Sequence, residues 1–166
     1  MIFTLIGMPG CGKSCMGRTL SSKLKMRLID SDKLIEANAN KKLSELIGEI
    51  GNDGFRELEE KTLLSINEDN IILSTGGSAV YSDAAMKHLK SLGKVIYLYC
   101  SYPVIKERLG DFSKRGVIMA PGQTLQDLYD ERTSLYKKYA DIIVSCDGKA
   151  YSRYQSSLLK IINRYL

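Results

Sequence analysis

The 166-residue sequence contains one histidine and four cysteines, and no two cysteines stand in a CxxC spacing. Structural zinc sites draw on closely spaced Cys and His ligands, so the sequence offers no such set. We therefore expect no zinc, and reduced thiols of the kind usual in cytosolic proteins.

Long apolar runs are also missing: none approaches the ~20 residues that a membrane-crossing helix needs. Residues 1–7 are apolar, but they end at a glycine and show neither the basic region nor the small-residue cleavage site of a signal peptide. These two absences predict a cytoplasmic protein with no membrane partner.

The chain has no basic tract, although its net charge is +5. Its 24 Lys and Arg residues are spread along the sequence without interleaved aromatic residues, so we expect no nucleic-acid partner. A small anionic substrate accounts equally well for the mild excess of positive charge.

Short aliphatic runs alternate with longer segments of helical period, which predicts strands at residues 2–6, 27–29, 71–74, 95–99 and 141–144. Such alternation favours a parallel sheet, because parallel strands require crossover connections that place helices over both faces. The predicted fold class is α/β, a three-layer α/β/α arrangement with a five-stranded parallel sheet. The length predicts a single domain over residues 1–166, and we expect a monomer.

Two segments interrupt this alternation. Residues 32–67 keep a helical pattern that breaks at 51–54, so we expect more than one helix there. Residues 110–123 contain glycines and show no sustained hydrophobic period. We interpret the first as an acceptor-binding insert and the second as a lid loop. An ordinary helical hairpin and a surface loop explain the pattern equally well.

A phosphate-binding motif follows the first predicted strand and opens a helix. It matches GxxxxGK[ST] and reads Gly7, Met8, Pro9, Gly10, Cys11, Gly12, Lys13 and Ser14, with Cys15 next in the helix. Its glycines let backbone amides surround a phosphate, while Lys13 reaches the β and γ phosphates and the Ser14 hydroxyl ligates Mg²⁺. These residues predict an ATP site. Cys11 is either a thiol with a depressed pKa or a small filler.

Other P-loop classes are excluded by missing motifs. The sequence has no Asn-Lys-x-Asp guanine reader and no Asp-x-x-Gly, which argues against a switch GTPase. At 166 residues it is too short for an AAA-type or transport ATPase, whereas a small-molecule or nucleotide kinase fits.

Two further strand ends carry polar or glycine residues. Asp30 and Asp32 end the second strand, where one carboxylate can hold Mg²⁺ and the other can accept a hydrogen bond from a substrate hydroxyl. Capping of the next helix is an alternative role for this pair. The third strand leads into Gly76, Gly77 and Ser78, where the two glycines let backbone approach a ligand.

Arg132 lies on the apolar stripe of a predicted helix, which also contains Leu125, Leu128, Leu135 and Tyr139. A charge on such a face needs a partner, unless the stem snorkels to solvent.

In order and spacing, these elements resemble the shikimate kinase family along nearly the whole chain. The resemblance implies that Asp30 takes the metal and Asp32 the acceptor hydroxyl. Gly54-Phe55-Arg56-Glu57-Leu58-Glu59 resembles the family's Phe-Arg-x-x-Glu, which implies that Arg56 grips the substrate carboxylate and Glu59 orients it. Arg132 matches a second carboxylate-binding arginine.

The same resemblance assigns Arg108 and Arg115 as lid arginines, with Arg115 over the transferring phosphoryl group. The chain departs from the family at Ser78, where a third glycine is usual, and at Gly116-Val117-Ile118, where the family has Pro-Leu-Leu. The implied reaction converts ATP and shikimate to ADP and shikimate 3-phosphate with Mg²⁺. Alternatives are a kinase for another small hydroxy acid or polyol such as quinate or gluconate, and a non-catalytic ATP-binding module.

Overall fold

The computed structural model describes residues 1–110, 117–148 and 151–166. Its sheet has five parallel strands in the order β2-β3-β1-β4-β5. Their bounds are Ile2–Ile6 for β1, Arg27–Asp30 for β2, Ile71–Ser74 for β3, Gly93–Tyr99 for β4 and Ile142–Ser145 for β5. All five strands predicted from the sequence are present, and the α/β prediction is confirmed.

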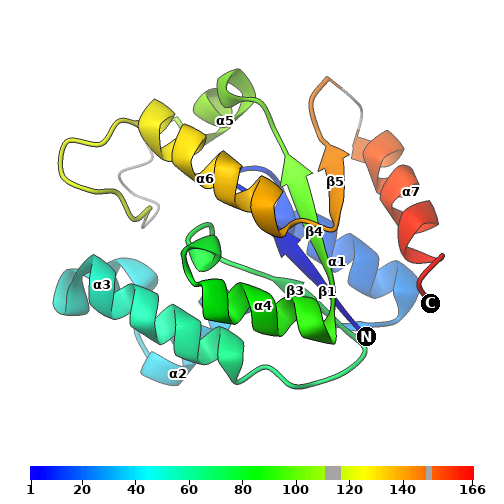
Figure 1. The fold of residues 1–166 in the computed structure, drawn as a ribbon, viewed down its shortest axis with the longest axis horizontal. Helices are drawn as coiled ribbons and strands as arrows, with labels where there is room; N and C mark the ends of the chain where they lie inside the picture. The colour runs from blue at the N-terminus through cyan, green and yellow to red at the C-terminus, as the bar shows by residue number, and fades with distance from the viewer. Residues whose placement is uncertain (111–116, 149–150) are drawn as a thin grey trace.

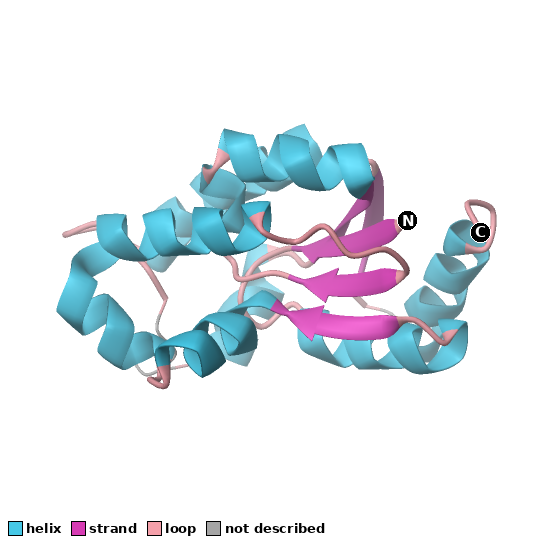
Figure 2. Ribbon diagram, turned by 90° about the horizontal axis from the view of Figure 1, so that it is seen from below, coloured by secondary structure: helices cyan, strands magenta, loops and turns pink. Residues whose placement is uncertain are grey.

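Helices cover both faces of this sheet (Figure 1, Figure 2). They are α1 Lys13–Leu24, α2 Ser31–Ala39, α3 Leu43–Leu64, α4 Asp83–Leu92, α5 Tyr102–Leu109, α6 Leu125–Tyr139 and α7 Tyr151–Ile162, with a 3₁₀ turn η1 at Ala79–Tyr81. In Figure 1, α4 and α6 cross in front of the strands and α1 lies behind them. The three-layer prediction is therefore confirmed.

The central strands are apolar because both of their faces are covered. Every residue of β1 and of β3 is buried, as a parallel sheet between two helical layers requires. Helix α1 lies close against the sheet at Gly17, where a Cβ atom would come within 2.9 Å of the Leu28 side chain. The core thus fixes the start of α1, and with it the phosphate loop.

The segment between β2 and β3 contains two helices, α2 and α3, as its pattern predicts. The predicted break near Gly51 is a kink inside α3, where this residue has φ 72° and ψ 176°. A small separate core packs the two helices together from Ile35, Leu46, Phe55 and Ile118. Because Ile118 belongs to the predicted lid segment 110–123, this small core joins the insert to the described end of that segment.

The carboxyl ends of the strands share one edge of the sheet, and the motifs singled out in the sequence lie there. Arg115 and Gly116 lie outside the described residues, as does the rest of segment 111–116. Among the described helices, none combines the length and the hydrophobicity needed to cross a membrane.

Candidate active site

The phosphate loop turns tightly between β1 and α1. Gly10 and Gly12 have φ values of 81° and 98°, in the left-handed region that favours glycine. Gly12 caps α1 without a side-chain hydrogen bond, so no side chain of the cap residue occupies the first amides of the helix. Lys13 is buried, and its Nζ donates to the carbonyls of Gly7 at 2.7 Å and Met8 at 3.0 Å. This cradle offers amides and one ammonium to an anion.

Cys11 faces the core beneath this loop. Burial raises the pKa of its thiol, although the nearby Lys13 ammonium opposes the shift. The geometry therefore favours the small-filler interpretation over a reactive thiolate. Cys15, in contrast, is exposed on α1. Arg108 of α5 donates a hydrogen bond from Nη1 to the Gly10 carbonyl at 3.3 Å, so the Arg108 guanidinium lies at the rim of the loop.

Asp30 has two roles at the start of α2. Its Oδ1 accepts hydrogen bonds from the backbone amides of Asp32 and Lys33, so the capping interpretation is confirmed for Asp30. Its Oδ2 accepts from the Ser14 hydroxyl at 3.3 Å. The cap fixes the Asp30 carboxylate beside Ser14, and these are two oxygen donors of the kind that Mg²⁺ prefers.

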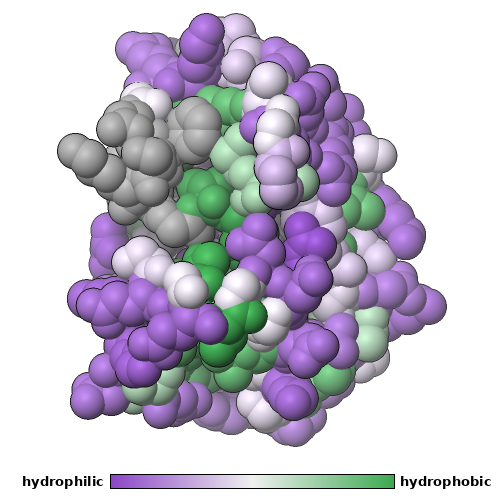
Figure 3. Space-filling view, turned by 90° about the vertical axis from the view of Figure 1, so that its left-hand side faces the viewer, coloured by the Kyte–Doolittle hydropathy of each residue, from purple (hydrophilic) through white to green (hydrophobic). Residues whose placement is uncertain are grey.

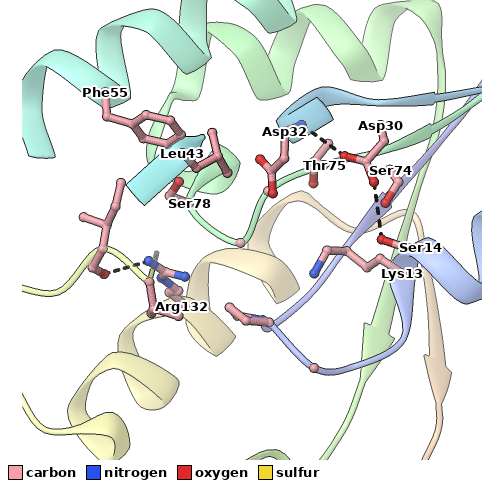
Figure 4. A pocket seen from close by; sticks show the side chains of 16 residues that line it. Lys13, Ser14, Asp30, Asp32, Leu43, Phe55, Ser74, Thr75, Ser78 and Arg132 are labelled. Carbon is pink, nitrogen blue, oxygen red and sulfur yellow. Dashed lines mark hydrogen bonds between the residues drawn. The ribbon is translucent and has the colours of Figure 1, made fainter. Parts of the chain in front are cut away.

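A cavity of about 190 Å³ extends from the phosphate loop toward α6. The carboxyl group of Asp32 points into the space between Lys13 and Arg132 (Figure 4). Its apolar wall comes from the insert, through Leu43 and Phe55, and from the predicted lid segment, through Val117 and Ile118. At this end of the molecule the surface is hydrophilic around the rim and hydrophobic in the middle (Figure 3).

Two carboxyl groups, the half-buried Asp32 and the buried Glu59, approach Gly76 just after β3. A Cβ atom on Gly76 would lie 2.6 Å from both Asp32 Oδ1 and Glu59 Oε1, so a side chain there would displace these two carboxyl groups. Burial, reinforced by the charge of Asp30, raises the pKa of Asp32 to about 6. Burial also raises the pKa of Glu59 to about 7, against the opposing hydrogen bond from Ser78. Both groups therefore titrate close to neutral pH.

Arg132 is only 2% exposed, which contradicts the snorkelling alternative. Its Nη2 donates to the Ile118 carbonyl at 2.9 Å, and a Cβ atom on Gly77 would lie 2.7 Å from Nη1. The Gly77 carbonyl is held by the Tyr136 hydroxyl at 2.6 Å. A buried guanidinium thus lies at the far end of the cavity from Lys13 (Figure 4).

Arg56 lies in a neighbouring cavity of about 240 Å³, which it lines together with Glu59, Ser78 and Tyr81. Its guanidinium carbon is 4.2 Å from the centre of the Tyr81 ring. The Ser78 hydroxyl donates to Glu59 Oε2 at 2.5 Å, and Ser78 lines both cavities. The structure therefore pairs Glu59 with Ser78, and Arg56 with the aromatic ring.

Several lining residues were not singled out in the sequence. Ser74 and Thr75 precede Gly76 directly, so their position at a strand end could have indicated them. Leu43 lines the cavity through the packing of the insert, and Tyr81 and Tyr136 contact the arginine end through tertiary packing. No local pattern marks these three positions.

A doubly wound parallel sheet with a GxxxxGK[ST] cradle, and a second carboxylate facing a cavity beside it, defines a P-loop small-molecule kinase. The family model for shikimate kinase matches residues 9–163. The chain belongs to the shikimate kinase family.

Individual relatives match this chain over nearly its full length. The chain is 36% identical over 159 residues to a shikimate kinase from Clostridium botulinum, covering 95% of this chain and 94% of that protein. It is 33% identical over 161 residues to one from Sulfurihydrogenibium sp., covering 96% of each. The solved structure of shikimate kinase from Acinetobacter baumannii in complex with shikimate is similar with TM-score 0.89 and 28% identity, covering 99% of this chain and 93% of that one.

Proposed function

We propose that this chain is a shikimate kinase, which transfers the γ-phosphate of ATP to the 3-hydroxyl of shikimate and releases ADP and shikimate 3-phosphate. One observation carries the proposal: a single cavity places the Asp32 carboxyl between the phosphate-loop Lys13 and the buried Arg132. A hydroxy acid in that cavity could present its hydroxyl to Asp32 while Arg132 binds its carboxylate.

On the donor side, the backbone N–H groups of residues 7–14, apart from Pro9, and the Lys13 ammonium would hold the ATP phosphates. Lys13 would exchange its bonds to the Gly7 and Met8 carbonyls for phosphate oxygens. Ser14 and Asp30 suit Mg²⁺, which is commonly bound by one or two protein oxygens together with substrate phosphates. When bound, that ion would neutralise phosphate charge.

On the acceptor side, Asp32 would accept the hydrogen bond of the attacking hydroxyl and take its proton. Arg132 offers a planar fork of donors that matches a carboxylate, and Arg56 with Glu59 lies beside it. The apolar wall of Leu43, Phe55 and Ile118 would exclude water from the transferring group. Positioning and charge neutralisation account for most of the catalysis in such a site.

The proposal includes the domain organisation expected from the sequence. Residues 1–166 would act as one kinase domain and as a monomer, with an acceptor-binding insert at about 32–67 and a lid at about 110–123. Arg108 would contact the nucleotide from the rim of the phosphate loop. Arg115 would supply a further cation to the transferring phosphoryl group.

Release of ADP by the purified protein, measured with ATP, Mg²⁺ and shikimate, quinate or gluconate in separate reactions, tests this function. We expect turnover with shikimate to exceed turnover with the other two acceptors. Lys13→Ala serves as the inactive control, because it removes the phosphate-binding ammonium without touching the acceptor end. Clear turnover of quinate or gluconate without shikimate-dependent ADP would contradict the proposed acceptor. ATP binding without turnover of any acceptor would indicate a non-catalytic module.

A further inference from the structure

Tyr81 lies where the two candidate carboxylate-binding arginines approach each other. It ends the 3₁₀ turn η1, which packs against α3 on one side and α6 on the other. The guanidinium carbon of Arg56, from α3, is 4.2 Å from the ring centre, and that of Arg132, from α6, is 5.5 Å away. Arg132 Nε also donates to the Tyr81 hydroxyl at 3.4 Å. One aromatic side chain therefore contacts both guanidinium groups.

Neither arginine has a carboxylate partner in the described part of the chain. No Asp or Glu oxygen there lies within 4.0 Å of a charged nitrogen of Arg56 or Arg132. Glu59, the carboxyl nearest in sequence on the same face of α3, is held by Ser78. The Nε of Arg56 is buried and has no hydrogen-bond partner among the described residues. A buried donor of this kind needs an acceptor, which a ligand can provide.

An aromatic ring and a carboxylate hold a guanidinium in different ways. A carboxylate binds the N–H edge and would compete with an anionic substrate for the same donors. A ring binds the face of the guanidinium through its quadrupole, so the N–H groups at the edge remain available. The stack on Tyr81 thus restricts the position of the Arg56 guanidinium without occupying its N–H donors.

We propose that Tyr81 is a positioning residue for the acceptor site, whose ring stacks on the Arg56 guanidinium and leaves its N–H edge free for the carboxylate of the substrate, beside Arg132. This inference rests on the proposed function, and it adds a specificity role to a residue outside the family motifs identified in the sequence. The ring, rather than the hydroxyl, makes the contact with Arg56. The proposal therefore predicts different effects for leucine and for phenylalanine at this position.

Steady-state kinetics of Tyr81→Leu and Tyr81→Phe test the proposal. In Tyr81→Leu we expect the KM for shikimate to rise about five- to thirty-fold, the equivalent of losing a partly desolvated cation–π contact. Its kcat and its KM for ATP should stay within about two-fold of the wild type, because Lys13, Asp30 and Asp32 line the first cavity, which Tyr81 does not line. Tyr81→Phe keeps the ring and should restore the KM to within about two-fold.

A matched control is available at Tyr165, whose ring lies 5.2 Å from the Lys94 ammonium, near the end of the chain and outside both cavities. Tyr165→Leu should leave both KM values unchanged. An unchanged acceptor KM in Tyr81→Leu, or an equal rise in Tyr81→Phe, would overturn the proposal. The proposal would also be overturned if Tyr81→Leu lowered both kcat and the melting temperature but left the KM for the acceptor unchanged.

Wild-type turnover separates this inference from the proposed function. If the wild type phosphorylates quinate or gluconate and not shikimate, the proposed acceptor is wrong, and the same KM comparison is made with the carboxylate acceptor that it uses. If it phosphorylates none of the three, the carboxylate site is contradicted, and the role of Tyr81 is contradicted with it.

Discussion

The Ser78 hydroxyl donates a hydrogen bond of 2.5 Å to Oε2 of Glu59, at the boundary between the two cavities. Ser78 stands where the family usually has a third glycine, so this bond is a consequence of the departure found in the sequence. Glu59 is 2% exposed, and its other oxygen lies beside Gly76 without a partner among the described residues. The pair therefore fixes a buried carboxyl next to the proposed acceptor hydroxyl.

Glu59 should make the stability of the protein depend on pH. Burial raises its pKa from 4.5 to about 7, so the folded protein binds this proton more tightly than the unfolded chain does. Its contribution to the free energy of unfolding is complete below about pH 4.5 and is lost as the pH rises through about 7. We expect that loss to be about 3 kcal/mol, and to be absent in Glu59→Gln.

Urea unfolding of the wild type and Glu59→Gln at about pH 4 and about pH 8 measures this difference. Glu57→Gln is the control, because Glu57 is exposed on the same helix and should leave the pH dependence unchanged. Parallel pH dependences for the wild type and Glu59→Gln would show that Glu59 ionises normally in the folded protein.

Asp32 should set the acidic limb of the activity. Its pKa of about 6 in the free protein means that the carboxylate needed to accept the hydroxyl proton is lost as the pH falls below about 6. We expect kcat/KM to fall about tenfold per pH unit below that point, and Asp32→Asn to lose about 10²–10⁴-fold at neutral pH. Asp53→Asn, at an exposed position of the insert, should retain the wild-type profile. If the residual activity of Asp32→Asn falls with decreasing pH just as the wild-type activity does, another group is responsible for the acidic limb.

The close approach of Gly77 to Arg132 makes a methyl group at this position a sensitive probe. A Cβ atom there would lie 2.7 Å from Arg132 Nη1 and 2.9 Å from the Pro9 ring, so the guanidinium must shift in Gly77→Ala. We expect the KM for the acceptor to rise about tenfold or more, which is the cost of one weakened charge-assisted hydrogen bond.

Gly48→Ala is the matched control for this substitution. Gly48 is exposed in α3, and a Cβ atom there would contact nothing within 4 Å. It should leave kinetics unchanged and stabilise the helix by about 0.5–1 kcal/mol. Equal acceptor KM values in Gly77→Ala and Gly48→Ala would mean that Arg132 does not bind the acceptor.

The sequence predicts the fold and the donor side well, because the signals there are local. The eight residues of the phosphate loop are contiguous, and a strand before them and a helix after them set their geometry. The two helices of the insert and the kink at Gly51 follow from a long helical period that breaks at residues 51–54. Arg132 could be placed on a buried face for the same reason, since its neighbours repeat with the helical period.

The acceptor side depends on contacts between distant elements, which local patterns do not record. On α6 the predicted stripe included Leu135, which is only partly buried, and omitted Tyr136, which is fully buried and holds the Gly77 carbonyl. Both residues fit a helical period, and packing against β4 decides which of the two side chains is buried. The Arg56 stack on Tyr81 joins α3 to η1, so it depends on how these two elements pack.

A crystal structure of the protein with ADP and shikimate tests the central claim most directly. The account predicts that the shikimate carboxylate lies within hydrogen-bond distance of Arg132 and Arg56, while the 3-hydroxyl lies within the same distance of an Asp32 carboxyl oxygen. Shikimate bound with its carboxylate remote from both arginines, or with another hydroxyl at Asp32, would contradict it.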